Sequence, residues 1–166
     1  MAKREIERTV QPSLLDRLTD DDWRSSADRT TTYAESLRAF KLGVQRDLEW
    51  LLNTRRTPDE PPEELSGLAR SLYVYGIPDV TSLSRDSRPA RLKLVKQVEE
   101  ALEIFEPRLS NVLISLVEGD AENNRRELRF VVEATLHLDP TPEQVVFDTV
   151  LQFSSGQYSV DAPGDA

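Results

Sequence analysis

The sequence predicts an α+β domain in which N-terminal helices pack on one face of a C-terminal antiparallel meander of three to four strands. Apolar residues recur at helical spacing in the first two thirds of the chain and alternate with polar residues after residue 109. Helices followed by strands are typical of this class, and short turns make neighbouring strands antiparallel. The 166 residues, 38% of them hydrophobic, suffice for one core. The expected boundaries are 1–12 for a flexible tail, 13–32 for a short helical anchoring segment, 33–160 for a single domain and 161–166 for a second flexible tail.

The anchoring segment is predicted from three leucines. Leu14, Leu15 and Leu18 share one face of a short helix, and Ser13 is placed to cap its first turn. The acidic run 20–22 then interrupts the pattern. We therefore expect these leucines to attach a loose arm to another surface.

A long helix is predicted over residues 32–53. The proline-rich segment 57–62 ends it, and a second, short helix is expected over 65–72. Gly76 is expected to close that short helix in a left-handed conformation, and Pro78 prevents its continuation. The buried stripe of the long helix is expected to contain Leu37, Phe40, Val44, Leu48, Leu51 and Leu52, and that of the short helix Leu65, Leu68, Ala69 and Leu72.

A further long helix is predicted over residues 88–105. Its basic residues lie in the N-terminal half and its acidic residues in the C-terminal half, which opposes the helix dipole. This inversion is easier to understand if the helix ends meet charged groups in the fold or on a partner. Its expected buried stripe is Leu92, Val95, Val98, Leu102 and Phe105.

Alternation after residue 109 predicts the strands. A turn over 118–124 and a break over 139–142 separate three strands, and residues 158–160 are expected to add a short edge strand. The inward-facing residues are expected to be Val112, Ile114 and Leu116 in the first strand, Leu128, Phe130, Val132, Ala134, Leu136 and Leu138 in the second, and Val145, Phe147, Thr149, Leu151 and Phe153 in the third.

The motif Glu106-Pro107-Arg108 lies at the end of the last predicted helix. Proline pushes the residue before it out of helical geometry, so Glu106 is expected to be the first non-helical residue. Residues two apart in an extended stretch project to the same side, so Glu106 and Arg108 are expected to be presented together. This arrangement favours docking to a protein, although a helix stop with an incidental surface ion pair has the same spacing.

Composition excludes several classes of function. The formal charge of −9 opposes general binding to nucleic acids or anionic membranes, and the absence of cysteine removes thiolate chemistry and disulfides. The chain lacks a signal peptide pattern and an apolar run of membrane-spanning length, so the cytoplasm is the expected location. His137, the single histidine, is out of phase with the inward-facing residues, so we expect a solvated side chain and neither a metal site nor a cofactor site.

Pairs of carboxylates suggest one catalytic alternative, the hydrolysis of glycosides. An acid and a base for glycoside hydrolysis can be drawn from Glu99, Glu103 and Glu106, or from Glu118 and Asp120 at the predicted hairpin tip. Such a pair needs one carboxyl group in an apolar cleft, and the sequence indicates no protected acid. No catalytic residue is therefore expected.

A basic cluster precedes the motif in an otherwise acidic chain. Arg88 and Arg91 are its candidate contact residues for an acidic partner, and a solvated face is the simpler interpretation. The cluster comprises Arg85, Arg88, Arg91, Lys93 and Lys96.

Three segments resemble the baseplate wedge family of contractile tails: LLNTRR at 51–56, SLYVYGIPDV at 71–80 and IFEPRL at 104–109. The segment PSLLDRLTDD, which begins at Pro12, resembles the amino-terminal segment of the TssE group, the type VI secretion members of this lysozyme-like wedge family. The resemblance extends from Pro12 to about Phe153, with the segments in the family's order. In the family, the Glu-Pro-Arg motif marks a contact surface in the wedge core.

The resemblance implies a cytoplasmic structural subunit of a membrane-docked baseplate, not an enzyme. It implies wedges built with TssF, TssG and TssK around the spike hub. It also implies a sheet edge that helps to start the TssB and TssC sheath by strand addition. Two alternatives stay open: an anti-adaptor-like protein-binding module, which shares the fold, and a peptidoglycan-cleaving enzyme suggested by the family's name.

Overall fold

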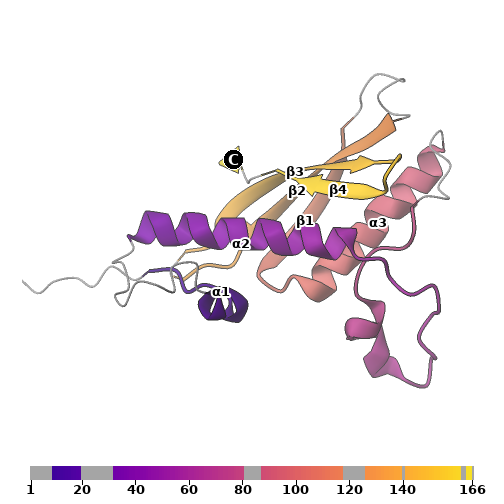
Figure 1. Ribbon diagram of the computed structural model, residues 1–166, viewed down its shortest axis with the longest axis horizontal. Helices are drawn as coiled ribbons and strands as arrows, with labels where there is room; N and C mark the ends of the chain where they lie inside the picture. Colours follow the sequence, from indigo (N-terminus) through magenta and orange to yellow (C-terminus); the bar gives the residue numbers. More distant parts are fainter. Residues whose placement is uncertain are drawn as a thin grey trace, which may run out of the picture. The chain divides into compact units, whose positions relative to one another are not determined.

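The computed structural model describes residues 9–19, 32–80, 87–117, 126–139, 141–161 and 164–165 (Figure 1). Its contacts form two compact units, Met1–Val44 and Gln45–Ala166, whose boundary falls inside helix α2. The helices are α1 (Leu14–Leu18), α2 (Tyr33–Asn53), the 3-10 helices η1 (Ser66–Arg70) and η2 (Leu72–Val74), and α3 (Arg88–Phe105). The strands are β1 (Leu109–Leu116), β2 (Glu127–Leu136), β3 (Glu143–Gln152), β4 (Gln157–Val160) and β5 (Gly164–Asp165).

The first unit contains α1 and the start of α2. The Ser13 hydroxyl accepts the Asp16 N–H at 3.2 Å and donates to the Asp16 carboxylate at 2.7 Å, which confirms the predicted cap. Val10, just before α1, is buried, and its N–H donates to the Ser36 hydroxyl on α2 at 3.0 Å. The three leucines of α1 are exposed: Leu14 by 70%, Leu15 by 49% and Leu18 by 75%.

Helix α2 confirms the predicted helix over 32–53. The Thr32 hydroxyl accepts the Glu35 N–H at 3.3 Å, and the Glu35 carboxylate accepts the Thr32 N–H at 2.9 Å. This reciprocal capping box satisfies donors that a helix start leaves unpaired. The expected stripe is buried at Phe40, Val44, Leu48, Leu51 and Leu52, and Leu37 is half-buried.

The short helix predicted over 65–72 is divided into two segments, and its expected buried stripe is wrong. Both segments are 3-10 helices, and Leu65 and Leu72 are 55% and 81% exposed. Ser71 separates the 3-10 helices in an extended conformation, and its hydroxyl accepts the Tyr73 N–H at 3.2 Å. A serine side chain that bonds the nearby backbone competes with helical hydrogen bonds, so the leucine spacing is not converted into a buried stripe.

Gly76 has the expected positive φ, 101°, directly after Tyr75, the C-cap of η2, and it also adjoins a parallel backbone bridge between Arg55 and Ile77. The Ile77 N–H donates to the Thr54 carbonyl at 2.8 Å, and the Arg56 N–H donates to the Ile77 carbonyl at 3.0 Å. A Cβ atom at Gly76 would lie 2.3 Å from the Thr54 carbonyl oxygen. Glycine is therefore needed here both for its φ and for the close approach of two backbones.

Helix α3 has the predicted bounds, and Glu106 is its C-cap as expected. Its buried face differs from the prediction, because Leu92 is 51% exposed and Leu94 is buried. Val95 and Phe105 are half-buried. Both stripes contain Val98 and Leu102 at helical spacing, so the sequence alone does not choose between them. The residues that are buried are Leu94, Val98, Ala101 and Leu102.

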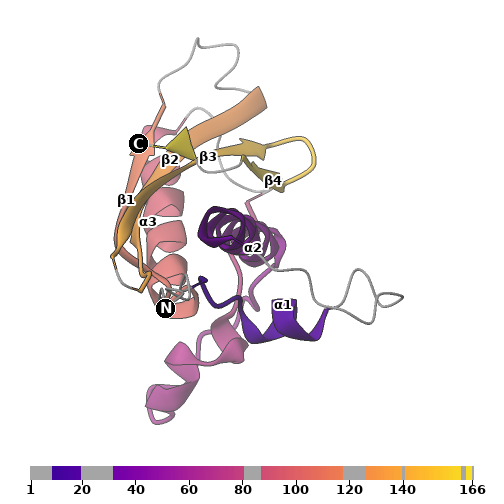
Figure 2. The same cartoon turned by 90° about the vertical axis from the view of Figure 1, so that its left-hand side faces the viewer.

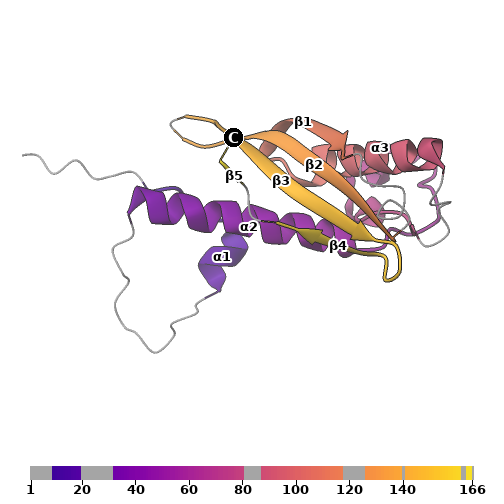
Figure 3. The same ribbon diagram turned by 90° about the horizontal axis from the view of Figure 1, so that it is seen from above.

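The strands form an antiparallel sheet in the order β1-β2-β3-β4, and β5 pairs with β3 (Figure 3). The predicted inward residues of β2 and β3 are buried, but β2 ends at Leu136 and Leu138 is half-buried beyond it. Strand β5 was not predicted, and the predicted turn over 118–124 lies outside the described residues. In β1, Val112, Ile114 and Leu116 are half-buried and alternate with exposed residues, as expected.

In the second unit, α3 packs against β1, and α2 from Gln45 onward lies beside β4 (Figure 2). Both helical segments lie on the face of the sheet where the side chains are buried, which confirms the α+β prediction. Phe130 of β2 and Tyr158 of β4 meet edge-to-face in this core, with ring centroids 6.4 Å apart.

Tyr158→Phe is expected to keep or raise the free energy of unfolding at neutral pH, by up to about 1 kcal/mol, because the buried Tyr158 hydroxyl has no hydrogen-bond partner among the described residues. Burial raises the pKa of Tyr158 above 10.0. As the pH rises, Tyr158 therefore ionises in the unfolded protein before it ionises in the folded protein. The free energy of unfolding of the wild type consequently falls above pH 10.0.

Urea unfolding at neutral pH and above pH 10.0 measures both effects. The variant should lose less stability than the wild type on the alkaline side. Tyr73→Phe, which removes a more exposed hydroxyl, should leave the neutral value unchanged. A clear loss of stability in Tyr158→Phe at neutral pH would contradict the prediction.

Candidate functional site

The Glu-Pro-Arg motif forms the tight connection between α3 and β1. The Glu106 N–H donates to the Leu102 carbonyl at 2.9 Å and so completes the helix end. The Leu109 N–H donates back to the Glu106 carbonyl at 3.0 Å, which closes a turn around Pro107 and Arg108. The Arg108 carbonyl then accepts the His137 N–H at 2.8 Å, next to the end of β2. The motif is thus held by backbone bonds on both sides.

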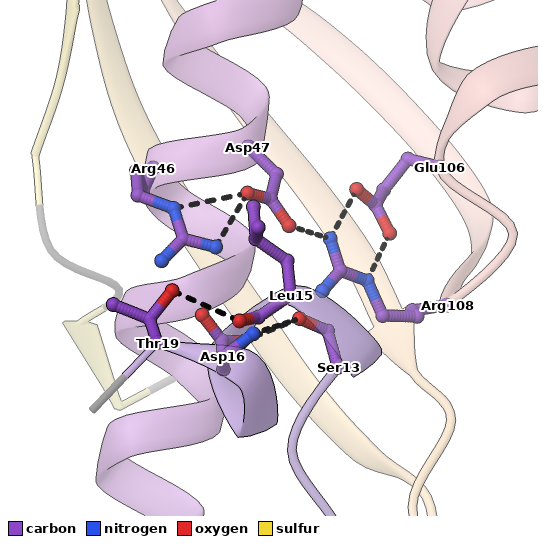
Figure 4. Close-up of polar contacts among 8 residues, drawn as sticks. All are labelled: Ser13, Leu15, Asp16, Thr19, Arg46, Asp47, Glu106 and Arg108. Carbon is purple, nitrogen blue, oxygen red and sulfur yellow. Dashed lines mark hydrogen bonds and ion pairs between the residues drawn. The ribbon is translucent and has the colours of Figure 1, made fainter.

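The side chains of Glu106 and Arg108 lie together, as predicted, but residues 107–108 form a turn and not the expected extended stretch (Figure 4). The Arg108 Nε donates to Glu106 Oε1, and Nη2 donates to Glu106 Oε2 at 2.6 Å. The same Nη2 donates to Asp47 Oδ2 on α2 at 2.7 Å. The exposed fractions are 5% for the Glu106 side chain, 21% for Arg108 and 23% for Asp47. The pair is therefore largely enclosed within the second unit.

Asp47 extends the network to the surface. Its Oδ1 accepts from Arg46 Nε at 3.1 Å and Nη2 at 2.8 Å. The Arg46 guanidinium lies 4.9 Å from the ring centroid of Trp50, which is 51% exposed. We call the alternating series Arg46, Asp47, Arg108 and Glu106 the charge chain (Figure 4). It joins α2 to the α3–β1 connection.

The electrostatics of the charge chain favour permanently charged arginine. Burial opposes the charged form of Arg108, but its hydrogen bonds and charge interactions with Glu106 and Asp47 outweigh this and raise the pKa of its guanidinium. Burial, followed by the charges of Asp47 and Glu106, raises the pKa of the Tyr75 hydroxyl. Tyr75 packs edge-to-face on Phe105, with ring centroids 5.1 Å apart. This arrangement binds charged groups to each other and suits a fixed junction better than proton transfer.

Two other predicted site residues of the second unit, Arg88 and Arg91, lie far from the motif. Arg88 is exposed and Arg91 is half-buried in the first turn of α3, so the rise of the helix puts them roughly 25 Å from Glu106. Leu14, Leu15 and Leu18 belong to the first unit, and Arg85 lies outside the described residues. Within the second unit, the structure therefore brings the residues of the motif together and separates them from Arg88 and Arg91.

Asp47 is the site residue that the sequence reasoning missed. It shares a helix face with Val44 and Leu51, so its position in the buried stripe was the available signal. A charged residue on a buried face requires a partner of opposite charge. The sequence does not say that this partner is 61 residues away.

The carboxylates of the catalytic alternative lie only partly within the described residues. Glu106 is bound to Arg108, Glu103 is exposed, and Glu118 and Asp120 lie outside the described residues. Within the described ranges, no group of three or more histidine, cysteine or acidic side chains is placed to hold a metal. His137 is exposed, as expected.

A cavity of about 420 Å³ lies at the end of α2, beside the β3–β4 turn. An ion pair between Arg55 and Asp79, at 3.5 Å, stands at its rim, and both side chains are largely exposed. Asn53 and Tyr158 are also in its lining. The cavity is separate from the charge chain, and no residue of the motif lines it.

Compared with models of known protein families, residues 38–141 match the family described as baseplate wedge protein gp25. The matched range contains the whole charge chain. Searches of curated proteins and of solved structures find no match. In the part of the chain that the structure describes, no helix has the length and apolar character needed to cross a membrane.

Proposed function

Because the chain belongs to the baseplate wedge protein gp25 family, of which TssE is a member, we propose that it is a structural subunit of a type VI secretion baseplate that docks in the wedge through its Glu-Pro-Arg motif. The family is one of structural baseplate proteins, and the charge chain is the observation that carries the proposal. The proposed wedge partners are TssF, TssG and TssK, in a baseplate docked to the membrane from the cytoplasm.

We propose that the motif both fixes the connection between α3 and β1 and presents an exposed turn to a partner. Glu106 and Arg108 are enclosed, and Arg108 donates to both Glu106 and Asp47, so the pair fixes the connection between α3 and β1 relative to α2. Pro107 is exposed at the turn between them. Trp50 is exposed beside Arg46, at the opposite end of the charge chain. A rigid turn with an exposed apex reduces the ordering cost of binding, because the contact geometry exists before the partner arrives.

Exposed leucines offer a second contact. Leu14, Leu15 and Leu18 lie on the short helix α1, and all three are at least 49% exposed. Clustered apolar side chains of this kind are typical of protein contacts. We propose that α1 anchors the first unit to a wedge protein, and that Arg88 and Arg91 add contacts to an acidic surface.

Sheath initiation is the second part of the proposal. The antiparallel sheet has β1 and β4 as its outer strands, and an outer strand can pair with a strand from another protein. We propose that one of these edges receives a strand of the TssB and TssC sheath. The sheet would then serve as the first layer on which the sheath grows.

Pro107→Lys tests docking without disturbing the charge chain. The residue is exposed, so the variant should keep the wild-type unfolding midpoint while co-purification with TssF and TssG falls by about tenfold, as expected when bulk and charge enter a contact surface. The matched control is Pro58→Lys, the same substitution at another exposed proline, which should bind normally. Wild-type binding by Pro107→Lys would contradict docking through the motif.

A further inference from the structure

The two outer strands of the sheet differ in whether their free backbone groups are already bonded. In β4, the Asp161 N–H donates to Asp148 of β3, so by alternation the backbone groups of Tyr158 and Val160 point away from the sheet. Asn53 bonds both groups of Tyr158: its Oδ1 accepts the Tyr158 N–H at 2.9 Å, and its Nδ2 donates to the Tyr158 carbonyl at 2.9 Å. The β4 edge is therefore occupied at Tyr158.

Gln45 continues this cover two residues further along β4. Its Nε2 donates to the Val160 carbonyl at 2.6 Å. Gln45 and Asn53 are eight residues apart, about two turns, so they lie on the same side of α2, and both side chains bond β4. The two carboxamides bond β4 as a neighbouring strand would.

Among the residues that the structure describes, none covers strand β1 in this way. The Val117 N–H donates to the Arg129 carbonyl at 3.0 Å, so Val117, Ser115 and Leu113 bond toward β2. The backbone groups of Leu116 and Ile114 then point outward. Among the described residues, none outside the sheet forms a hydrogen bond with these outward groups.

The side chains at the β1 edge show what kind of strand would fit. Val112, Ile114 and Leu116 are only half-buried on the helix-facing side, whereas Phe130 and Val132 in the neighbouring strand are 1% exposed. An added strand with apolar residues at alternate positions would cover them next to α3. At the other end, a bulge between Ser110 and Leu113, with Asn111 at φ 52°, interrupts regular pairing, so the acceptor stretch is short.

We propose that the sheet accepts a strand on one side only. The outward groups of Ile114 and Leu116 receive a short extended segment of a sheath subunit with alternating apolar residues, and Gln45 and Asn53 keep β4 closed. The proposal rests on the sheath-initiating function proposed above and adds which edge carries it. A one-sided acceptor starts a sheath in one direction and does not chain with its own copies, since only one edge is open.

Residue-resolved amide exchange tests the proposal on the full-length protein. In the free protein, the amides of Ile114 and Leu116 should exchange fast, whereas those of Ser115 and Tyr158 should be protected by their bonds. Addition of the purified TssB–TssC complex should slow exchange at Ile114 and Leu116 and leave Tyr158 unchanged. Protection that appears on β4 instead of β1 would overturn the proposal.

Two proline variants provide a matched comparison. Ile114→Pro removes an outward N–H from β1 and should weaken sheath binding by about tenfold, the equivalent of one or two lost hydrogen bonds. Val160→Pro makes the same change at an outward position of β4 and should bind the sheath within about twofold of wild type. Unfolding curves of both variants establish that the folded protein is being compared. Equal binding by the two variants would overturn the assignment to β1.

The experiments distinguish an error in the choice of β1 as the acceptor strand from an error in the proposed baseplate function. If the wild type co-purifies with TssF and TssG and binds the sheath without protection at β1, the assignment is wrong and the baseplate function stands. If it binds neither, both are wrong. A concentration-dependent dimer protected at Ile114 and Leu116, without sheath binding, would show that a second copy occupies the edge and would overturn the proposal.

Discussion

Arg108→Ala is expected to lower the free energy of unfolding by about 3 kcal/mol, because it leaves the Glu106 carboxylate enclosed without its cation. Removing one partner of a buried ion pair costs more than the pair contributes, since the remaining charge stays desolvated. Arg108 is 21% exposed, so the loss is placed at the lower end of the range for buried pairs. Urea denaturation at neutral pH measures it.

Two variants locate the cause of this loss. Arg46→Ala removes the outer arginine of the same charge chain, which is 35% exposed, and should cost less than about 1 kcal/mol. Arg108→Lys keeps the charge but loses the fork that bonds Glu106 and Asp47 together, so its stability should lie between those of Arg108→Ala and the wild type. Wild-type stability in Arg108→Ala would contradict the structural role of the motif.

The expected loss changes how a docking defect is interpreted. An alanine at Glu106 or Arg108 weakens both the fold and any contact, so reduced wedge assembly in these variants does not separate the two effects. Pro107→Lys does separate them, because Pro107 is exposed and outside the charge chain. If all three variants lose assembly only in proportion to their lost stability, the motif is a structural junction alone.

Gly76→Ala is expected to destabilise the protein by at least about 2 kcal/mol, because φ at this position is 101° and non-glycine residues are strained there. The new Cβ atom would also lie 2.3 Å from the Thr54 carbonyl oxygen, so the backbone has to move. This movement would break the bond from the Ile77 N–H to the Thr54 carbonyl. Both thermal and urea unfolding should show the loss.

The matched control is Gly67→Ala in η1. A Cβ atom at Gly67 meets nothing within 4 Å, and its φ is not positive, so alanine should be neutral or stabilise by up to about 1 kcal/mol through a less flexible unfolded chain. Amide exchange at Ile77 provides a local readout, and it should accelerate in Gly76→Ala only. Equal stability of the two variants would contradict the role given to the close approach of the Thr54 and Gly76 backbones.

Residues with a strong local signal were predicted well. The long helices α2 and α3, the cap at Ser13 and the alternation in β2 follow from spacing and turn chemistry within a few residues. The buried face of α3 was predicted less well, because two overlapping stripes share Val98 and Leu102 and differ at Leu92 and Leu94. The position of the sheet beside the helix chooses between them.

By itself, the sequence determined the fold class, the family and the place where α3 ends, because each depends on short-range patterns or on recognisable segments. Only the tertiary structure decided what the Glu-Pro-Arg motif contacts and which sheet edge the side chains of α2 bond. Asp47 reaches Arg108 across 61 residues, and Asn53 reaches Tyr158 across 105. Charged and amide side chains take whichever partner the packing of helices and strands brings near, and that distance is not encoded in any local period.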